Sequence, residues 1–497
     1  MSGWPERPVI YEVNTAVWLA ELSSAAEEPV TLATVPDFAW DAITPAGADA
    51  VWLMGVWERS PAGLELAKAN PDLLESFREA LPDLREQDII GSPYCVHRYV
   101  ADERFGGPAG LAAARTALAA RGVRLILDYV PNHVAPDHPW VTLGDPDLFI
   151  QGDQDDLKAD PAGWLLAGER VLAHGRDPYF PPWPDVVQLN AFSAPTRAAT
   201  ARTLADIADQ CDGIRCDMAM LMTNDVFART WGAHAGPRPD EEFWPQVIAD
   251  LRGHAGHSET VLIAEAYWDM EWTLQQQGFG FCYDKRLYDR IIGGNPPAVR
   301  DHLRADLGYQ SKLLRFLENH DEPRIASELP PVLQRAAAVA IATLPGATMW
   351  HEGQFEGRRA RVPVFLQRRP DEPADKELGS WYRDLLARVA GQRVRTGDWQ
   401  LLEAAGWPDN QSCQNLLAWS WSGDGDGEAG RHLIVVNLSE EPAQGRIRLP
   451  WPDLPGRSWR LTDAEGDGEF ERDGEELAGE GLYVDMRPGQ SYLLAVR

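Results

Sequence analysis

DGIRCDMAM, residues 212–220, has the pattern of a short buried strand that carries two charged residues, Arg215 and Asp217. Side chains two positions apart on a strand point to the same face, so these two charges are expected to lie together. The residues around them are apolar or small, and buried charges are costly unless they are paired. The stretch alone leaves open a structural ion pair and a functional site. Similar charged clusters at three other predicted strand ends favour a functional site.

The composition limits what the chain can be. At 497 residues it is too long for one ordinary domain, which predicts a large body with one or two accessory domains. A formal net charge of −30 argues against nucleic acid and anionic membrane surfaces as partners, whereas a neutral substrate is indifferent to that field. Five cysteines without paired spacing argue against a disulfide framework or a zinc site.

The sequence carries no sign of membrane targeting. The first residues, MSGWPERPVIYEV, lack a basic region followed by an apolar run, so we expect no signal peptide. No stretch reaches the roughly 20 apolar residues of a membrane span. We therefore expect a cytoplasmic protein.

Short apolar runs alternate with helical patterns through the first four fifths of the chain. The runs are 9–14, 48–57, 123–130, 211–217, 260–268, 279–284, 313–321 and 347–353. Clear helical patterns lie between them, at 108–121, 196–210 and 331–343. This alternation is typical of a parallel sheet covered on both faces. Eight such runs predict an α/β fold, the (β/α)8 TIM barrel, with a site at the carboxyl ends of its strands.

Two segments depart from this alternation. Residues 134–190 are rich in Asp, Pro, Gly and Trp without a clear helix, which predicts a small inserted domain after strand three. After about residue 400, short alternating segments between turns predict a C-terminal antiparallel β-sandwich. The predicted domains are the first part of the catalytic barrel at 1–133, the loop-rich insertion at 134–190, the second part of the barrel at 191–400 and the β-sandwich at 401–497.

Polar residues follow four of the predicted strands at their carboxyl ends. They are Asp128, Asn132 and His133 after the third, Arg215 and Asp217 after the fourth, Glu265 after the fifth, and Asn319, His320 and Asp321 after the seventh. In a barrel these side chains converge on one mouth. Cleavage of a glycosidic bond needs such a set: a nucleophile, a proton donor and charge that opposes an oxocarbenium-like state.

In this combination the motifs resemble the four conserved regions of the α-amylase family, glycoside hydrolase family 13. The four are DYVPNH at 128–133, GIRCD at 213–217, IAEAYW at 263–268 and ENHDEP at 318–323. VQLN at 187–190 resembles the family's fifth region. GSPYCVHRY at 91–99 is similar to the segment whose tyrosine stacks under the sugar. The resemblance covers the barrel, the insertion and the C-terminal domain.

The resemblance implies the catalytic roles. Asp217 would be the nucleophile, Glu265 the acid/base, and Asp321 the residue that binds sugar hydroxyls and stabilises the transition state. Arg215 would hold Asp217 ionised, because an adjacent positive charge lowers the pKa of a carboxyl group. The apolar neighbours of Glu265 independently favour a raised pKa, which keeps a proton on it near neutrality.

The resemblance also implies substrate-binding residues. His133 and His320 would donate hydrogen bonds to sugar hydroxyls, and Tyr94 would form the stacking platform. The alternative for both histidines is a place in the core. Asp128 is expected to orient its neighbours rather than take part in the chemistry.

Aromatic residues supply further candidates for sugar stacking. Trp140, Trp164, Trp183, Trp268 and Trp350 are candidates, with core packing as the alternative for each. The proline-stiffened run DPYFPPWPD, 177–185, predicts that Tyr179, Phe180 and Trp183 face the substrate cleft. Cys216 is expected to point away from Arg215 and Asp217, because strand side chains alternate.

The chain departs from common family patterns at three places. Met220 and Leu221 stand where many α-amylases have a Lys-His pair that contacts the leaving-group side. Gly91 stands where many enzymes that trim chain ends have an Asp, although Asp88 is close by. Arg358, Arg359 and Arg361 cluster after the eighth strand, where we expect ion pairs with surface carboxylates rather than an anion site.

From the residues and the resemblance together we expect a retaining hydrolase of short or small α-glucosides, without an organic cofactor. Some relatives bind calcium, partly through the Asn at the position of Asn132. Asp153, Asp155 and Asp156 are candidate ligands here, but the metal site stays unassigned.

Two alternative functions stay open. A transglycosylase, isomerase or phosphorylase would use the same covalent intermediate with a sugar, a small alcohol or phosphate in place of water. A non-catalytic sugar-binding protein on this fold is the remote alternative, against which the presence of all three carboxylates argues. The sequence does not predict an oligomeric state.

Overall fold

A closed barrel of eight parallel strands lies at the centre of the molecule. The computed structural model describes residues 3–254, 256–423, 430–464, 466 and 468–497. The barrel order is β1-β15-β14-β13-β12-β11-β5-β2. The strands are β1 (Val9–Asn14), β2 (Ala50–Met54), β5 (Arg124–Tyr129), β11 (Gly213–Cys216), β12 (Val261–Ala264), β13 (Phe281–Tyr283), β14 (Leu313–Arg315) and β15 (Ala347–His351). The predicted TIM barrel is confirmed.

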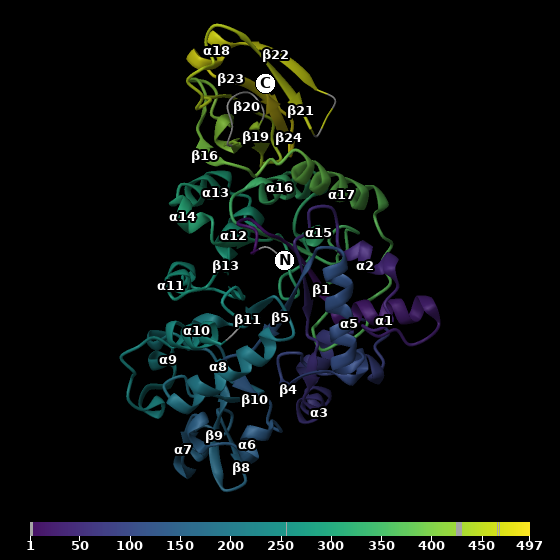
Figure 1. The fold of residues 1–497 in the computed structure, drawn as a ribbon, viewed down its shortest axis with the longest axis vertical. Coiled ribbons are helices and arrows are strands. Elements are labelled where there is room, and N and C mark those ends of the chain that lie inside the picture. Colours follow the sequence, from purple (N-terminus) through teal and green to yellow (C-terminus); the bar gives the residue numbers. More distant parts are fainter. Residues whose placement is uncertain (1–2, 255, 424–429, 465, 467) are drawn as a thin grey trace.

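Helices surround this barrel (Figure 1). They include α1 (Thr15–Ala26), α5 (Gly107–Ala120), α8 (Ala194–Ala208), α10 (Phe243–Gly253), α12 (Lys285–Ile292), α16 (Pro331–Thr343) and α17 (Lys376–Gly391). Strand side chains alternate between two apolar layers, as on β2, where Val51 and Leu53 pack in the outer layer and Trp52 and Met54 fill the interior. Inward-facing polar side chains therefore end up at the mouth or inside the barrel.

The inserted segment forms a small antiparallel sheet of its own. Its strands are β6 (His133–Val134), β7 (Gln151–Gly152), β8 (Trp164–Ala167), β9 (Arg170–Gly175) and β10 (Trp183–Gln188), with the short helices α6 (Pro139–Leu143) and α7 (Gln154–Ala159). A separate apolar cluster that includes Phe149, Leu172 and Val187 holds it together. The sequence predicted mainly loops here, because the strands are separated by segments rich in Asp, Pro and Gly and show no clear alternating pattern.

Two antiparallel sheets form the C-terminal domain, at the opposite end of the molecule from the insertion (Figure 1). The larger sheet contains, in order, β16 (Asp398–Leu402), β18 (Leu416–Ser422), β19 (Arg431–Asn437), β24 (Ser491–Val496), β21 (Ser458–Asp463) and β22 (Glu469–Asp473). The smaller contains β17 (Ala404–Ala405), β20 (Ala443–Ile447) and β23 (Leu482–Met486). The predicted sandwich is confirmed, although β16 begins at Asp398, before the predicted start of the domain at residue 401.

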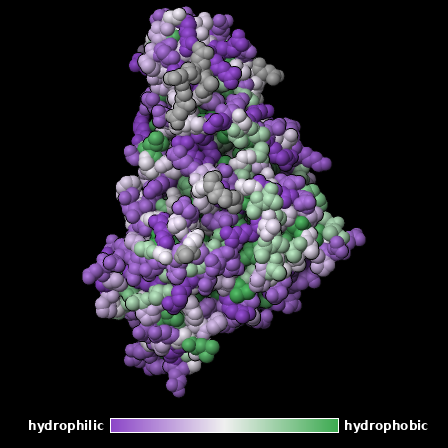
Figure 2. Space-filling view, in the orientation of Figure 1, coloured by the Kyte–Doolittle hydropathy of each residue, from purple (hydrophilic) through white to green (hydrophobic). Residues whose placement is uncertain are grey.

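The short helix α18 (Gly474–Gly479) was not predicted. The face of the molecule in Figure 2 is mainly hydrophilic, with small scattered apolar areas. Among the described residues, no helix has the length and apolar character needed to cross a membrane.

Candidate active site

The side chain of Arg215 is the centre of the candidate site. It projects from β11 into the barrel, where it is 1% exposed. Its Nη1 donates a hydrogen bond of 2.7 Å to Asp217 Oδ1, and its Nη2 forms an ion pair of 2.8 Å with Glu265 Oε2. The rings of Trp52, Tyr94 and Tyr283 lie 5.2–5.7 Å from the guanidinium carbon. One buried cation, held by aromatic faces, thus joins the two carboxylates that the sequence predicted to be catalytic.

Backbone hydrogen bonds between β11 and β12 fix the two carboxylates side by side. The amide of Glu265 donates to the carbonyl of Cys216 over 3.0 Å, and the amide of Ala219 donates to the carbonyl of Glu265 over 3.1 Å. Met218, with a left-handed φ of 42°, directs its amide to Glu265 Oε2 at 2.6 Å. Cys216 packs in the outer layer, on the opposite face of β11 from Arg215, as predicted.

Glu265 has the properties of a group that carries a proton near neutrality. It is 3% exposed, and the hydroxyl of Tyr267 donates to its Oε1 over 3.1 Å. Burial raises the pKa of Glu265 to about 7, although Arg215 opposes the shift. The direction agrees with the prediction made from its apolar neighbours.

The expectation for Asp217 is corrected. Burial raises the pKa of Asp217, and the nearby positive charge of Arg215 only partly offsets this shift. The sequence argument counted the cation but left out the cost of removing the carboxylate from water. Arg215 therefore limits the upward shift rather than lowering the pKa below its ordinary value.

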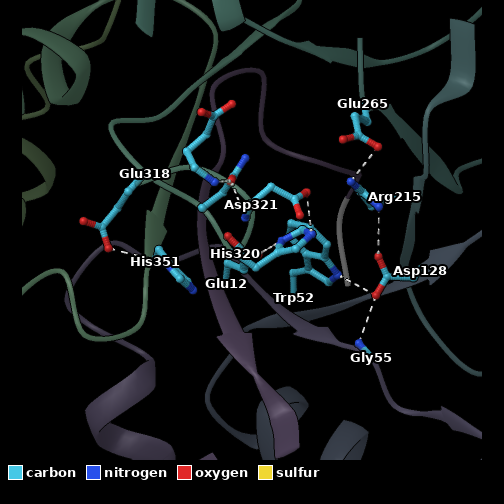
Figure 3. Close-up of polar contacts among 12 residues, drawn as sticks. Glu12, Trp52, Gly55, Asp128, Arg215, Glu265, Glu318, His320, Asp321 and His351 are labelled. Atoms are coloured by element: carbon cyan, nitrogen blue, oxygen red, sulfur yellow. Dashed lines mark hydrogen bonds and ion pairs between the residues drawn. The ribbon is translucent and has the colours of Figure 1, made fainter. Parts of the chain in front are cut away.

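A second chain of charges crosses the mouth of the barrel beside the first. His320 Nε2 lies 2.9 Å from Asp321 Oδ2 and 2.6 Å from the hydroxyl of Tyr94, whose ring is stacked on the imidazole at 5.4 Å. His320 Nδ1 lies 2.5 Å from Oε1 of Glu12, which projects from β1 (Figure 3). Burial opposes ionisation of Asp321, but His320 outweighs it and lowers the pKa of that carboxyl to about 2.

These groups open into one cavity of about 380 Å³, termed here the catalytic cavity. Its lining residues include Tyr94, His133, Trp183, Asp185, Asp217, Glu265 and Asp321. The structure therefore brings together every predicted catalytic residue, with Tyr94 and His133 beside them. His320 and Arg215 lie behind the wall and act on the carboxylates in it.

His133 is not a charged residue in this setting. Burial lowers the pKa of His133 to about 4, and its Nε2 lies 3.2 Å from the carbonyl oxygen of Tyr94. The ring of Trp183 meets it edge-on at 5.5 Å. His133 therefore reaches the cavity as a neutral ring, and its contact with sugar stays a prediction.

An adjoining cavity of about 370 Å³ shares Met218 and Tyr267 with the catalytic cavity. Phe180 and Trp268 are among its lining residues, so Phe180 and Trp183 face the cleft as predicted. Tyr179 lines neither cavity; it is 58% exposed and packs edge-on against Trp268 at 4.9 Å.

The other aromatic candidates do not reach these cavities. Trp350 is fully buried, Trp164 is 7% exposed in the core, and Trp140 packs against the apolar cluster of the insertion. Core packing is the correct interpretation for these three. Asp128 has the predicted orienting role, because its Oδ2 accepts hydrogen bonds of 3.1 Å from Trp52 Nε1 and from the amide of Gly55.

The structure shows the surroundings of two of the places where the sequence departs from the family pattern. Met220 and Leu221 are both buried, Met220 in the outer apolar layer, and neither lines the catalytic cavity. Asp88 is held by hydrogen bonds of 2.8 and 3.0 Å from Arg368, which keep the pKa of this carboxyl low. It therefore does not replace the Asp that is missing at Gly91.

The prediction of ion pairs for the arginine cluster is wrong. Arg358 and Arg359 donate to the backbone carbonyls of Glu372 and Ala326. Arg361 donates to the carbonyl of Asp321 over 2.6 Å. These arginines hold loops at the barrel mouth. A guanidinium group has five N–H donors, and backbone carbonyl oxygens accept from them here in place of carboxylates.

The candidate calcium ligands are engaged with other protein groups. Asn132 exchanges hydrogen bonds of 2.9 and 3.1 Å with the side chain of Gln188. Asp153 and Asp156 cap the start of α7, and Asp155 pairs with Lys158 at 3.2 Å. Among the residues that the structure describes, no group of three or more His, Cys, Asp or Glu is arranged to hold a metal ion.

Sequence reasoning missed three groups of this site: Glu12, Tyr267 and Asp185. Glu12 carried a visible signal, a lone charge on the inward face of the apolar run VIYEVN, the same pattern that singled out Arg215. Tyr267 lies two residues after Glu265 in the third motif, and this closeness in sequence was the available signal. Asp185 lies in the irregular insertion, and nothing in the sequence sets it apart.

The site and the fold together define the class of protein. A carboxylate cluster lies at the mouth of a (β/α)8 barrel, with a domain inserted after the third strand and a β-sandwich at the C-terminus.

No family model matches the chain. The chain is 25% identical over 480 residues to the alpha-amylase MalA of Haloarcula japonica, an alignment that covers 94% of this chain. It spans about 60% of the length of that relative.

Solved structures share the architecture along the whole chain. The maltogenic alpha-amylase AmyB of Thermotoga neapolitana aligns with a TM-score of 0.67 at 18% identity, and covers 99% of both chains. The alpha-amylase of H. orenii aligns with a TM-score of 0.70 at 17% identity, over 99% of this chain and 100% of that one. These likenesses show the shared fold. With the sequence relationship, they agree with the resemblance to the α-amylase family that the four motifs carry, and no subfamily is assigned.

Proposed function

We propose that this protein is a retaining glycoside hydrolase that cleaves α-glucosidic bonds in short or small α-glucosides. The observation that carries the proposal is the pairing of Asp217 and Glu265 on one guanidinium, with Asp321 beside them in a single cavity. This arrangement suits a double displacement, which needs two carboxyl groups about 5–5.5 Å apart.

In the first step, an oxygen of Asp217 attacks the anomeric carbon of the sugar. The bond from that carbon to the leaving-group oxygen breaks, and Glu265 transfers its proton to this oxygen. Arg215 contributes by limiting the upward shift of the Asp217 pKa, while Glu265, with a pKa of about 7, holds its proton near neutrality. Asp321, ionised at any working pH, opposes the positive charge that develops on the ring.

In the second step, Glu265 acts as the base. It takes a proton from a water molecule, whose oxygen attacks the anomeric carbon, and the bond to Asp217 breaks. The sugar leaves with the configuration it had in the substrate. The amide of Met218 and the hydroxyl of Tyr267 hold the Glu265 carboxylate in place between the two steps.

The preference for short substrates rests on the cavity. Its volume of about 380 Å³ is at the lower end of small-molecule sites. Trp183 and Asp185, both from β10, offer an aromatic face and a carboxylate acceptor for hydroxyls at one end of it. The buried Met220 and Leu221 leave no polar side chain at these positions to hold a long chain on the leaving-group side.

Transfer to a second sugar or a small alcohol is the second candidate. The observation that favours it is the adjoining cavity, which meets the catalytic cavity at Met218 and Tyr267, next to the two carboxylates. A bound acceptor there would compete with water for the glycosyl group.

A panel of α-glucosides, incubated with and without sugar acceptors and followed by chromatography, tests both candidates. Hydrolysis of maltose-sized substrates in preference to polymeric starch supports the proposal. If the yield of new oligosaccharides exceeds the yield of free glucose, transfer rather than hydrolysis is the main activity. Complete inactivity on the panel, with folded protein, would contradict both.

A further inference from the structure

Glu12 is a buried carboxylate that the proposed mechanism does not use. It lies on the inward face of β1, between Trp52 of β2 and His351 of β15 in the barrel register, and it is 0% exposed. Its Oε1 lies 2.5 Å from His320 Nδ1. Its Oε2 has no hydrogen-bond partner among the described residues. The carboxylate therefore depends on His320 alone.

Both nitrogens of His320 face acidic groups, as Figure 3 shows for Glu12 on one side and Asp321 on the other. Nε2 has Asp321 Oδ2 at 2.9 Å and the hydroxyl of Tyr94 at 2.6 Å. Trp52 meets the ring edge-on at 5.4 Å, and Tyr94 stacks on it at the same distance. The ring has little freedom to turn away from either carboxylate.

Three proton arrangements fit these distances. In the first, called here the ionised arrangement, Glu12 is ionised and His320 carries a proton on both nitrogens. In the second, Glu12 is a neutral acid that donates to an uncharged ring. In the third, an uncharged His320 donates from Nδ1 to an ionised Glu12, and its Nε2 accepts from the hydroxyl of Tyr94. A buried carboxylate with a single contact is stabilised most by a cation at that contact.

The charges that face His320 favour the ionised arrangement. Asp321 is on the same loop, and Asp128 on β5 also lies close enough to interact with the ring. Arg215 on β11 is the opposing cation, but it is occupied by Asp217 and Glu265. Burial lowers the pKa of His320, yet Asp321 and Glu12 outweigh burial and raise the pKa well above its ordinary value.

We propose that Glu12 is a positioning residue: it keeps His320 as an imidazolium whose Nε2–H is directed at Asp321. Asp321 is then fixed in orientation and kept as an anion where positive charge develops on the sugar. The consequence for catalysis rests on the proposed function, but the charge state of His320 does not.

Replacement of Glu12 by Gln is the informative change, because Gln has the shape of a neutral Glu but no charge. We expect Glu12→Gln to let His320 lose its proton as the pH rises. Between pH 5 and pH 8, the kcat/KM of the variant should fall by a factor about ten times larger than the factor by which the wild-type kcat/KM falls. Glu318→Gln is the matched control, since Glu318 is equally buried and lies near His351 and Arg324, away from the cavity. It should keep the wild-type pH dependence.

Nitrogen NMR of the His320 side chain, assigned with His320→Gln, tests the charge state without any activity. We expect both ring nitrogens of the wild type to stay protonated from pH 5 to pH 9, and those of Glu12→Gln to titrate within that range. A neutral His320 in the wild type at pH 7, or a titration that Glu12→Gln leaves unchanged, would overturn the proposal. If Glu12→Gln does not fold, the wild-type spectrum alone decides. If the enzyme proves inactive, only the proposed function fails.

Discussion

At the scale of single residues, the site is built around two buried basic side chains that each contact more than one acid. Arg215 contacts Asp217 and Glu265, and His320 contacts Glu12 and Asp321. Sharing holds the carboxylates in place around the cavity. It also spreads the pKa values, with Asp321 at about 2 and Glu265 at about 7. Such a spread assigns separate roles to chemically similar groups.

The nucleophile assignment predicts the effect of Asp217→Asn. Turnover should fall by at least about 10³-fold, because no covalent intermediate can form, while substrate binding measured by calorimetry stays within a few-fold of the wild type. Cys216→Ser is the control on the same strand, and it should retain activity because Cys216 faces the outer layer. Turnover by Asp217→Asn near the wild-type rate would exclude Asp217 as the nucleophile.

The pKa of Glu265 predicts the alkaline limit of activity. Glu265 must be protonated to assist the leaving group, so kcat/KM should fall as the pH rises through about 7. Glucosyl fluoride needs little protonation of its leaving group, so Glu265→Gln should retain far more activity on it than on maltose. The rate of the glycosylation step of this variant should also not fall as the pH rises through about 7. An equal loss of activity on both substrates would argue against Glu265 as the proton donor.

At the scale of elements, the barrel and most of the site could be predicted from the sequence, and the insertion could not. The barrel strands are mostly apolar, because they are buried on both faces, and a charge at the end of a strand therefore stands out. The strands β12 and β14 end earlier than predicted, since Glu265 and Asp321 follow them in loops. In the insertion, short strands and proline-rich loops leave no periodic signal, so Asp185 went unnoticed.

The position of β10 predicts a role of the insertion in substrate binding. Trp183→Ala should raise KM for a short α-glucoside about three- to tenfold with a smaller change in kcat, because one stacking face is lost. Leu143, 87% exposed on α6 of the same domain, gives a control variant, Leu143→Ala, that should leave both constants unchanged. Equal effects of the two substitutions would mean that the insertion acts only through its stability.

At the scale of the whole molecule, three structural units divide the work. The barrel supplies the carboxylates, the insertion closes one side of the catalytic cavity, and the C-terminal sandwich lies at the far end (Figure 1). A net charge of −30 surrounds a site whose proposed substrate is uncharged, so the surface charge favours solubility without repelling the ligand. The chemistry is thus confined to one mouth of the barrel.

The stereochemistry of hydrolysis tests the central claim, that Asp217 and Glu265 carry out a double displacement. Proton NMR can follow the anomeric signals of the sugar during the first minutes of hydrolysis of an α-glucoside, before the anomers equilibrate. Because β11 and β12 are adjacent, we expect the two carboxyl groups to lie near the separation of about 5–5.5 Å that retention requires, rather than the 6.5–9.5 Å of inverting enzymes. The account predicts that the α-anomer is released first. Release of the β-anomer first would contradict it.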